Sequence, residues 1–231
     1  MPYWDWSRDH RDLFKAPVFD PDPVSGLGEN GACDDDCNIQ TGALSELSHS
    51  AVNLSWPIPH VLRRNMTVRA EPDDDPHNST VGVEFVSQAM EISTPGDYFM
   101  FQHKMTQIHN HIHNFVGGDL EGECPKIIPK YECSGSFTSN DPLFWLHHGQ
   151  MDRIWWNWQM AHPHNFDAFH GFALTKEFQQ MQTGWGDFKP NASVDHMLRF
   201  DHVTAPVHVS RTFNVSAPPF CYYYDDQEPP V

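Results

Sequence analysis

Two short histidine-rich segments constrain this chain more than any other feature of its sequence. The first reads His-Asn-His-Ile-His, and its outer members His109 and His113 are four residues apart, so they share one face if the segment is helical. A helix face with two imidazoles is half of a metal site, and the third ligand must come from another element. The pair His147-His148 is the obvious donor. Three imidazoles suit copper, zinc, iron or nickel, so the ligand type alone does not name the metal.

Local signals place both segments on helices. The first helix is expected to run from residue 97 or 98 to Val116, where Gly117-Gly118 end it. In the second, Asp141 suits the N-cap and Pro142 the first helical position. The run 143–159 then carries apolar residues at helical spacing, and Pro163 lies beyond its end.

The remaining chain is harder to interpret. Residues 20–40 and 68–80 are rich in Pro, Asp and Gly and are expected to be loops. Residues 82–92 show alternating apolar side chains, which we interpret as a short strand or an extended segment.

The residues around the histidines narrow the possibilities. They follow a fixed pattern, which reads His109-Asn110-x-x-His113, then Phe115-Val116-Gly117-Gly118, then Asp141-Pro142-x-Phe144-Trp145-Leu146-His147-His148-x-x-x-Asp152-Arg153-x-Trp155. This pattern resembles the second copper motif (CuB) of tyrosinases and catechol oxidases, the type-3 copper proteins. The resemblance implies that His109, His113 and His148 bind one copper. His148 is preferred because the family uses the second histidine of the pair, with His147 as its buried neighbour. His103 and His111 would face away from the ligands and are interpreted as ordinary.

The same resemblance extends over most of the chain. Residues 2–6, Pro-Tyr-Trp-Asp-Trp, look like a stretch just downstream of the family's first copper motif (CuA), and residues 60–64 look like its His-Cys-Leu-Arg-Arg stretch with valine for cysteine. Residues 220–225 contain the Tyr-x-Tyr that ends the family's central domain. We therefore predict a partial tyrosinase copper-binding domain over residues 1–225, starting after CuA, and a linker stub over residues 226–231.

This resemblance implies a mainly α fold. The two metal helices would form half of a four-helix-bundle dicopper domain with long irregular loops. Without the other helix pair, the apolar stripe over residues 143–158 is expected to be exposed.

In the family, two coppers held by six histidines oxidise o-diphenols to o-quinones with dioxygen, and in some members also hydroxylate monophenols. The implied partners are dioxygen and phenolic small molecules. Because no second half-site is evident among the other histidines, one copper is expected here. Asn110 is the residue type that orients a water to deprotonate the phenol, but its usual glutamate helper is missing between Asp97 and His109. This favours diphenol oxidation over monophenol hydroxylation.

Two alternatives belong to other functional classes. The first is a metal-binding protein without redox turnover, or an oxygen carrier like a haemocyanin unit. The second is a non-catalytic glycoprotein in which the helix pair is only scaffold. Oxygen uptake with a diphenol and the presence of bound metal discriminate among the three.

The overall charge limits the partners. Thirty-one acidic residues against 14 basic ones give a net charge of −17, which argues against nucleic acid and anionic membrane surfaces. No apolar run approaches the length of a membrane span. The sequence does not indicate an oligomeric state.

Cysteines and sequons favour a secretory history. Cys124 and Cys133 bracket the loop between the metal helices and are candidates for a disulfide, as are Cys33 and Cys37, which would leave Cys221 odd. Zinc binding by the cysteines is the competing idea, for which their spacing is poor. The chain also carries five N-x-Ser/Thr sequons, at Asn53, Asn65, Asn78, Asn191 and Asn214. The N-terminus shows no signal peptide, so we expect further residues upstream and a secreted protein.

Overall fold

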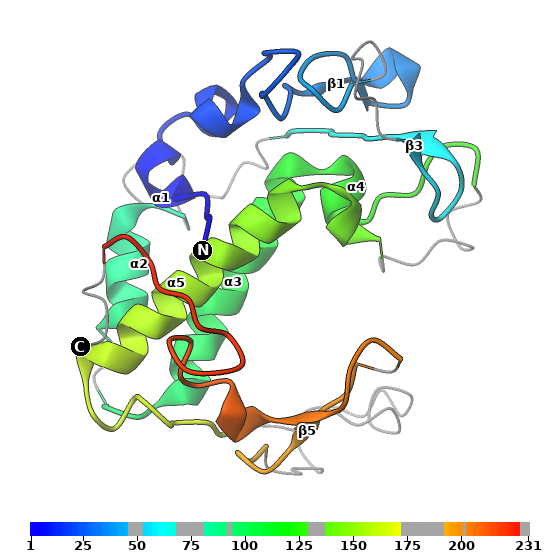
Figure 1. Cartoon of the computed structure of the whole chain (residues 1–231). Helices are drawn as coiled ribbons and strands as arrows, with labels where there is room; N and C mark the ends of the chain where they lie inside the picture. The colour runs from blue at the N-terminus through cyan, green and yellow to red at the C-terminus, as the bar shows by residue number, and fades with distance from the viewer. Residues whose placement is uncertain are drawn as a thin grey trace, which may run out of the picture. The chain divides into compact units, whose positions relative to one another are not determined.

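The computed structural model describes residues 1–45, 53–67, 81–91, 94–128, 137–171, 192–200 and 202–226. Its longer helices are α2 (Val83–Met90), α3 (Tyr98–Val116) and α5 (Leu143–Ala161), and its short ones are α1 (Trp6–Asp9) and α4 (Gly118–Glu121) (Figure 1). Five 3-10 turns lie at Leu13–Lys15, Pro17–Phe19, Cys33–Asp35, Thr138–Asn140 and Val209–Arg211 of the described chain. The predicted mainly α fold class is confirmed.

In the described residues, two-residue strands form three antiparallel pairs. β1 (Gly31–Ala32) pairs with β2 (Asn38–Ile39), β3 (Asn53–Leu54) with β4 (His60–Val61), and β5 (Met197–Leu198) with β6 (Val207–His208). Such short strand pairs connect loops by hydrogen bonds and are too small to form a sheet with a hydrophobic face.

The chain divides into two compact units. One comprises residues 2–89 and 105–152, and the other comprises residue 1 with residues 90–104 and 153–231. We call the first the histidine unit, because the histidines of both histidine-rich segments fall in it, and the second the C-terminal unit. The predicted bounds 1–225 and 226–231 stay a prediction.

Helix α3 has the predicted bounds, and α5 starts where predicted but runs beyond the predicted residue 159 to Ala161. The Asp141 carboxylate accepts a hydrogen bond from the Leu143 N–H at 2.9 Å, as an N-cap should, and α5 continues to Ala161. Helix α3 ends at Val116, and Gly117 follows with a φ of +63°. Only glycine adopts that conformation without strain, so the predicted stop signal has a backbone cause.

Helices α3 and α5 pack against each other in antiparallel order. In the histidine unit, the His113 ring lies 6.1 Å from the Phe144 ring, between centroids. In the C-terminal unit, Phe101 stacks on Trp158 at 4.4 Å and 12°. The contacts pair early residues of one helix with late residues of the other, as in neighbouring helices of a bundle.

The expectation of an exposed stripe on α5 is wrong. Leu143, Ile154 and Trp158 are all at least 97% buried. In the histidine unit the N-terminal segment covers the helix, because the Trp4 N–H donates to the Leu146 carbonyl at 3.0 Å. A Cβ on Gly149 would lie 2.5 Å from the Pro2 carbonyl oxygen, so only glycine allows this approach.

The expectation of a strand over residues 82–92 is also wrong. Val83–Met90 form helix α2, begun by the Phe85 and Val86 N–H groups donating to the Gly82 carbonyl. The residues that turn inward, Phe85, Val86 and Ala89, lie at helical spacing. The apparent alternation of apolar and polar residues therefore reflects a short helix with one buried face. Ile92 lies outside the described residues, as do residues 68–80.

The cysteines follow the sequence expectation where they are described. Cys33 and Cys37 form a disulfide, and Cys221 is free and exposed. Cys124 is also disulfide-bonded, while Cys133, its expected partner, lies outside the described residues. No helix in the described part of the chain combines the length and the apolar character that a membrane span requires.

Candidate metal centre

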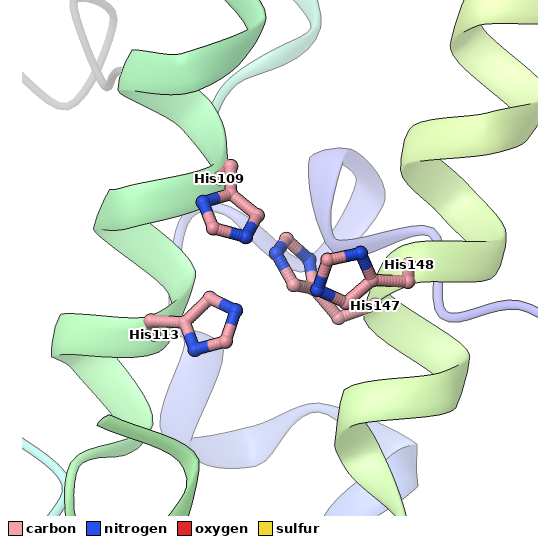
Figure 2. Close-up of side chains that lie close together, drawn as sticks. All are labelled: His109, His113, His147 and His148. Carbon is pink, nitrogen blue, oxygen red and sulfur yellow. The ribbon is translucent and has the colours of Figure 1, made fainter. Parts of the chain in front are cut away.

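Four histidine side chains meet between α3 and α5. Their candidate ligand nitrogens all lie within 4.8 Å of one another (Figure 2). The His109 and His113 rings, one helical turn apart, have centroids 4.4 Å apart, and the His148 ring lies 5.1 Å from the first and 5.8 Å from the second. His147 approaches both α3 rings, at 5.3 and 5.2 Å. Imidazoles gathered this closely are typical of a metal site.

His113 is oriented by a backbone carbonyl. Its Nδ1 lies 2.5 Å from the Leu120 carbonyl oxygen of α4. Since a carbonyl oxygen only accepts, the Nδ1 of His113 carries the proton and donates it. Its Nε2 is then unprotonated, and this buried atom has no hydrogen-bond partner in the described part of the protein. An unprotonated, unpartnered nitrogen facing three other imidazoles has the form of a metal ligand.

His147 has the opposite tautomer. The Trp6 indole Nε1–H donates to its Nδ1 at 3.2 Å, and indole nitrogen is a donor only. The Nδ1 of His147 is therefore unprotonated, and the proton of the neutral ring sits on Nε2. A protonated Nε2 does not bind a metal, so this contact favours His148 over His147 as the third ligand.

The His148 side chain points toward α3 and packs beside the aromatic ring of Phe144. Its ring lies 4.2 Å from that of Phe144 at 34°. Its Nε2 is buried and has no partner among the described residues. Burial, followed by the nearby His109 and His113, lowers the pKa of His148 to about 4.

The other two inner histidines are also held neutral. Burial lowers the pKa of His113, with His109 adding to the effect and the hydrogen bond to Leu120 opposing it. Burial also lowers the pKa of His147 well below its usual value. Neutral imidazole is the form that binds metal, so the lowered pKa values of His113 and His148 favour metal binding at neutral pH.

His109 and Asn110 interact with each other. The Nδ1 of His109 lies 2.9 Å from the Asn110 side-chain oxygen, so Nδ1–H donates and Nε2 remains available. Asn110 itself is exposed. Its predicted role in orienting a water stays a prediction.

Helix α5 is fixed at its start by a buried ion pair. The Arg64 Nε and Nη2 atoms donate to the two Asp141 carboxylate oxygens at 2.8 and 3.0 Å, and both side chains are fully buried. Arg64 also donates to the Leu27 and Gly28 carbonyls. The carboxylate that caps α5 is thus anchored, and with it the register of His148.

The structure brings together the three predicted ligands and places Asn110 at their edge. His103 is exposed and His111 half-buried, and neither belongs to the cluster. Two contributors escaped the sequence interpretation. Trp6 lies 141 residues from its partner, and Leu120 acts through its carbonyl, so no side-chain pattern marks it.

The chain is similar to known proteins along most of its length. The family description "Common central domain of tyrosinase" matches residues 1–161. A tyrosinase of Streptomyces glaucescens is 25% identical over 211 residues, which cover 87% of this chain and 68% of that protein. The tyrosinase ustQ of Aspergillus flavus is 26% identical over 229 residues, covering 97% of this chain and 56% of that protein. The chain therefore spans between half and about two thirds of the length of these curated relatives.

A solved structure has the same fold. It is that of a polyphenol oxidase variant from Thermothelomyces thermophila, with a TM-score of 0.63 and 19% identity, covering 96% of this chain and 65% of that one. At this identity the likeness concerns the fold alone.

Proposed function

Because the chain belongs to the tyrosinase family, we propose that its histidine cluster binds copper for the oxidation of o-diphenols to o-quinones by dioxygen. The single observation that carries this proposal is that the buried Nε2 atoms of His113 and His148, close to the ring of His109, have no hydrogen-bond partner among the described residues. The Nε2 of His147 also has none there, but it carries the ring proton because Trp6 donates to Nδ1. The nitrogens of His109, His113 and His148 would hold one copper. Copper, when bound, supplies the electron transfer from the diphenol to dioxygen.

The chain's own residues prepare the site in three ways. Leu120 and Trp6 fix which nitrogen of His113 and of His147 carries the proton. Burial lowers the pKa of His113, His147 and His148, which favours their neutral form at neutral pH. Phe144 forms an apolar wall beside His148, against which a phenol ring would pack.

The site as described supplies ligands for one copper. Among the residues that the structure describes, no other group of three or more candidate ligands lies close together. The family reaction uses a copper pair, so three further imidazoles would have to complete it. We therefore propose that diphenol oxidation is the activity of the complete dicopper site. The residues of this chain would bind one of its two coppers.

Oxygen uptake with catechol tests this division. We expect the copper-loaded chain to consume oxygen far more slowly than the Streptomyces tyrosinase under the same conditions, because one copper does not make the coupled two-electron site. Turnover equal to that of the relative, and abolished by His113→Ala, would show that the chain itself completes the pair.

The same measurement addresses the second candidate function, metal binding without turnover. What favours it is the single half-site among the described residues. If three histidine ligands are added by a complementary CuA segment and oxygen uptake still stays at background, the oxidase proposal is wrong and the metal-binding alternative replaces it.

We also propose that the protein passes through the secretory pathway. The Cys33–Cys37 disulfide and the exposed side chain of Asn214 support this. Expression in a secreting host should give a mass that falls on deglycosylation and also falls in Asn214→Gln. An unmodified mass would contradict the proposal.

A further inference from the structure

The orientation of His113 depends on the short helix α4. This helix supplies the Leu120 carbonyl that accepts the Nδ1 proton of His113 at 2.5 Å. A four-residue helix has little stability of its own. Something outside α4 must hold this carbonyl in place.

Asp119 of α4, the neighbour of Leu120, connects the helix to such an anchor in His60 and Arg63. Its side chain is fully buried. Its carboxylate accepts hydrogen bonds from the Arg63 backbone N–H at 3.0 Å and from the His60 Nε2 at 3.1 and 3.2 Å, and the Arg63 guanidinium lies 3.6 Å away. A buried carboxylate with this many donors fixes the backbone on which it sits.

His60 is a cation in this arrangement. Its Nδ1 lies 2.6 Å from the Ile58 carbonyl oxygen and its Nε2 faces the Asp119 carboxylate. Both neighbours are acceptors, so both ring nitrogens must donate, which only the imidazolium can do. Burial opposes the charge, but the hydrogen bonds to Asp119 and Ile58 and the charge of Asp119 prevail and raise the pKa of His60.

The backbone of residues 63–65 packs in direct contact with the backbone at the start of α4. The Asp119 N–H donates to the Arg63 carbonyl at 3.0 Å. A Cβ on Gly118, whose φ is +52°, would lie 2.3 Å from that same carbonyl oxygen, and a Cβ on Gly117 would lie 2.4 Å from the Asn65 carbonyl oxygen. The two glycines therefore let the 63–65 backbone lie directly on the turn that carries Leu120.

We propose that Asp119 and His60 are positioning residues for the ligand His113. They hold α4 so that the Leu120 carbonyl takes the Nδ1 proton, which leaves Nε2 as the metal-binding atom. This rests on the proposed function in one respect, that His113 binds copper. The placement of the proton on Nδ1 does not depend on it.

The first test uses the metal-free full-length chain. Two-dimensional ¹H–¹⁵N spectra of the imidazole rings report which nitrogen of each ring is protonated, and His113→Ala identifies the signals of His113. We expect the Nδ1–H tautomer of His113 in the wild type. In Asp119→Asn we expect the ratio of the Nδ1–H tautomer of His113 to its Nε2–H tautomer to fall about fivefold. A fivefold change corresponds to the loss of about one net hydrogen bond. A merely structural role for Asp119 would leave that ratio unchanged in the folded protein.

The second test measures Cu(I) affinity by competition with a chromogenic chelator. Partners in the outer shell of a metal ligand typically account for about 10- to 100-fold in affinity, and we expect Asp119→Asn to lie near the lower end. The matched control is Asp36→Asn, which also removes a carboxylate beside Arg63, at 3.5 Å, but one that hydrogen-bonds to Lys126 rather than to His60. We expect this control to keep the wild-type affinity.

Two further measurements test the proposal if the Asp119→Asn variant does not fold. His60→Gln keeps one donor toward Asp119 and should shift the His113 tautomer ratio in the same direction by less. In the wild type, raising the pH through the pKa of His60 should also shift the His113 tautomer ratio. The groups that His60 faces are Asp119, Arg63 and the Ile58 carbonyl. An unchanged ratio in folded Asp119→Asn, or in both of these measurements, overturns the proposal. A shifted ratio with no copper bound by the wild type would instead refute the proposed function and leave the positioning intact.

Discussion

At the scale of single residues, the imidazoles of His113 and His147 are each oriented by one hydrogen-bond partner outside the cluster. Neutral imidazole has one donor and one acceptor nitrogen, so the partner of one nitrogen decides the state of the other. A carbonyl oxygen faces Nδ1 of His113, and an indole N–H faces Nδ1 of His147. The two rings therefore present opposite nitrogens, one suited to bind a metal and one not.

Replacing Trp6 with phenylalanine tests the contact to His147. Trp6 is fully buried, so the change removes a hydrogen bond and some packing. We expect the free energy of unfolding to fall by about 1–3 kcal/mol, measured by urea denaturation. Trp145→Phe is the control, because Trp145 is 64% exposed and its change should stay within about 0.5 kcal/mol. Equal effects of the two changes would argue against the contact.

His148 should make the metal-free protein less stable in acid. Its pKa is about 4 in the folded chain and about 6.5 when unfolded. Between these values the unfolded chain binds a proton that the folded chain does not, so stability falls as the pH drops from about 6.5 toward 4. In His148→Gln the urea midpoint should fall less steeply between pH 7 and pH 5 than in the wild type.

The control for this pH series is His103→Gln, on the exposed side of α3. Its midpoints should run parallel to those of the wild type. If His148→Gln also runs parallel, His148 is not held neutral by burial.

The clustering of the three candidate ligands was accessible to sequence reasoning because their spacing is local. His109 and His113 share a helix face, and His148 follows a cap and a helical period that the sequence displays. The partners that select the nitrogens were not accessible. The Trp6 contact spans 141 residues, and the contribution of Leu120 is a backbone carbonyl that any residue would offer.

At the scale of elements, one short segment anchors two helices. Arg63 and His60 bind Asp119 of α4, and Arg64 binds Asp141 at the start of α5. The segment 60–64 thus sets both the carbonyl that orients His113 and the start of the helix that carries His148.

Removing the Asp141 side chain tests the second anchor. Asp141→Ala deletes a helix cap and leaves Arg64 as a buried, unpaired charge. We expect a loss of about 3–5 kcal/mol in the free energy of unfolding. The matched control is Asp97→Ala at the start of α3, since the Asp97 carboxylate accepts from the Met100 N–H at 3.1 Å. This carboxylate is partly exposed, and the His170 Nε2 lies 3.6 Å from it.

That control should cost about 0.5–2 kcal/mol, the usual contribution of a cap, to which the solvent-exposed pair with His170 adds little. Similar losses for both variants would mean that the Arg64–Asp141 pair adds nothing beyond capping.

Element boundaries were predictable where the chain carries local stop and start signals, as at Asp141 and at Gly117. Helix α2 was not, because its eight residues give too few turns to separate a helical period from alternation. The burial of α5 was not predictable either, since the covering segment at residues 2–6 belongs to a distant part of the sequence.

At the scale of the whole molecule, two histidines bound the pH range of stability from opposite sides. His148 has a lowered pKa and lies in the cluster, and His60 has a raised pKa and lies in the anchor segment. A lowered histidine pKa removes stability as pH falls, and a raised one removes it as pH rises. Stability of the metal-free protein should therefore be greatest near neutral pH.

His60→Gln should reveal the alkaline limit. The folded chain holds the His60 proton to higher pH than the unfolded chain, so its contribution is complete below about 6.5 and is lost as pH rises through the folded pKa. We expect the wild-type urea midpoint to fall between pH 6 and pH 9 and that of His60→Gln to fall less. Parallel curves would contradict the charged state assigned to His60.

The most direct test of the account is the amount of copper bound per chain. The purified protein is loaded with copper and desalted, and metal and protein are then measured. We expect about one copper per chain, the number that three imidazoles hold. It should be lost in His113→Ala and retained in His103→Ala, on the exposed face of the same helix. Copper retained by His113→Ala, or no copper on the wild type, would contradict the assignment of His109, His113 and His148 as ligands.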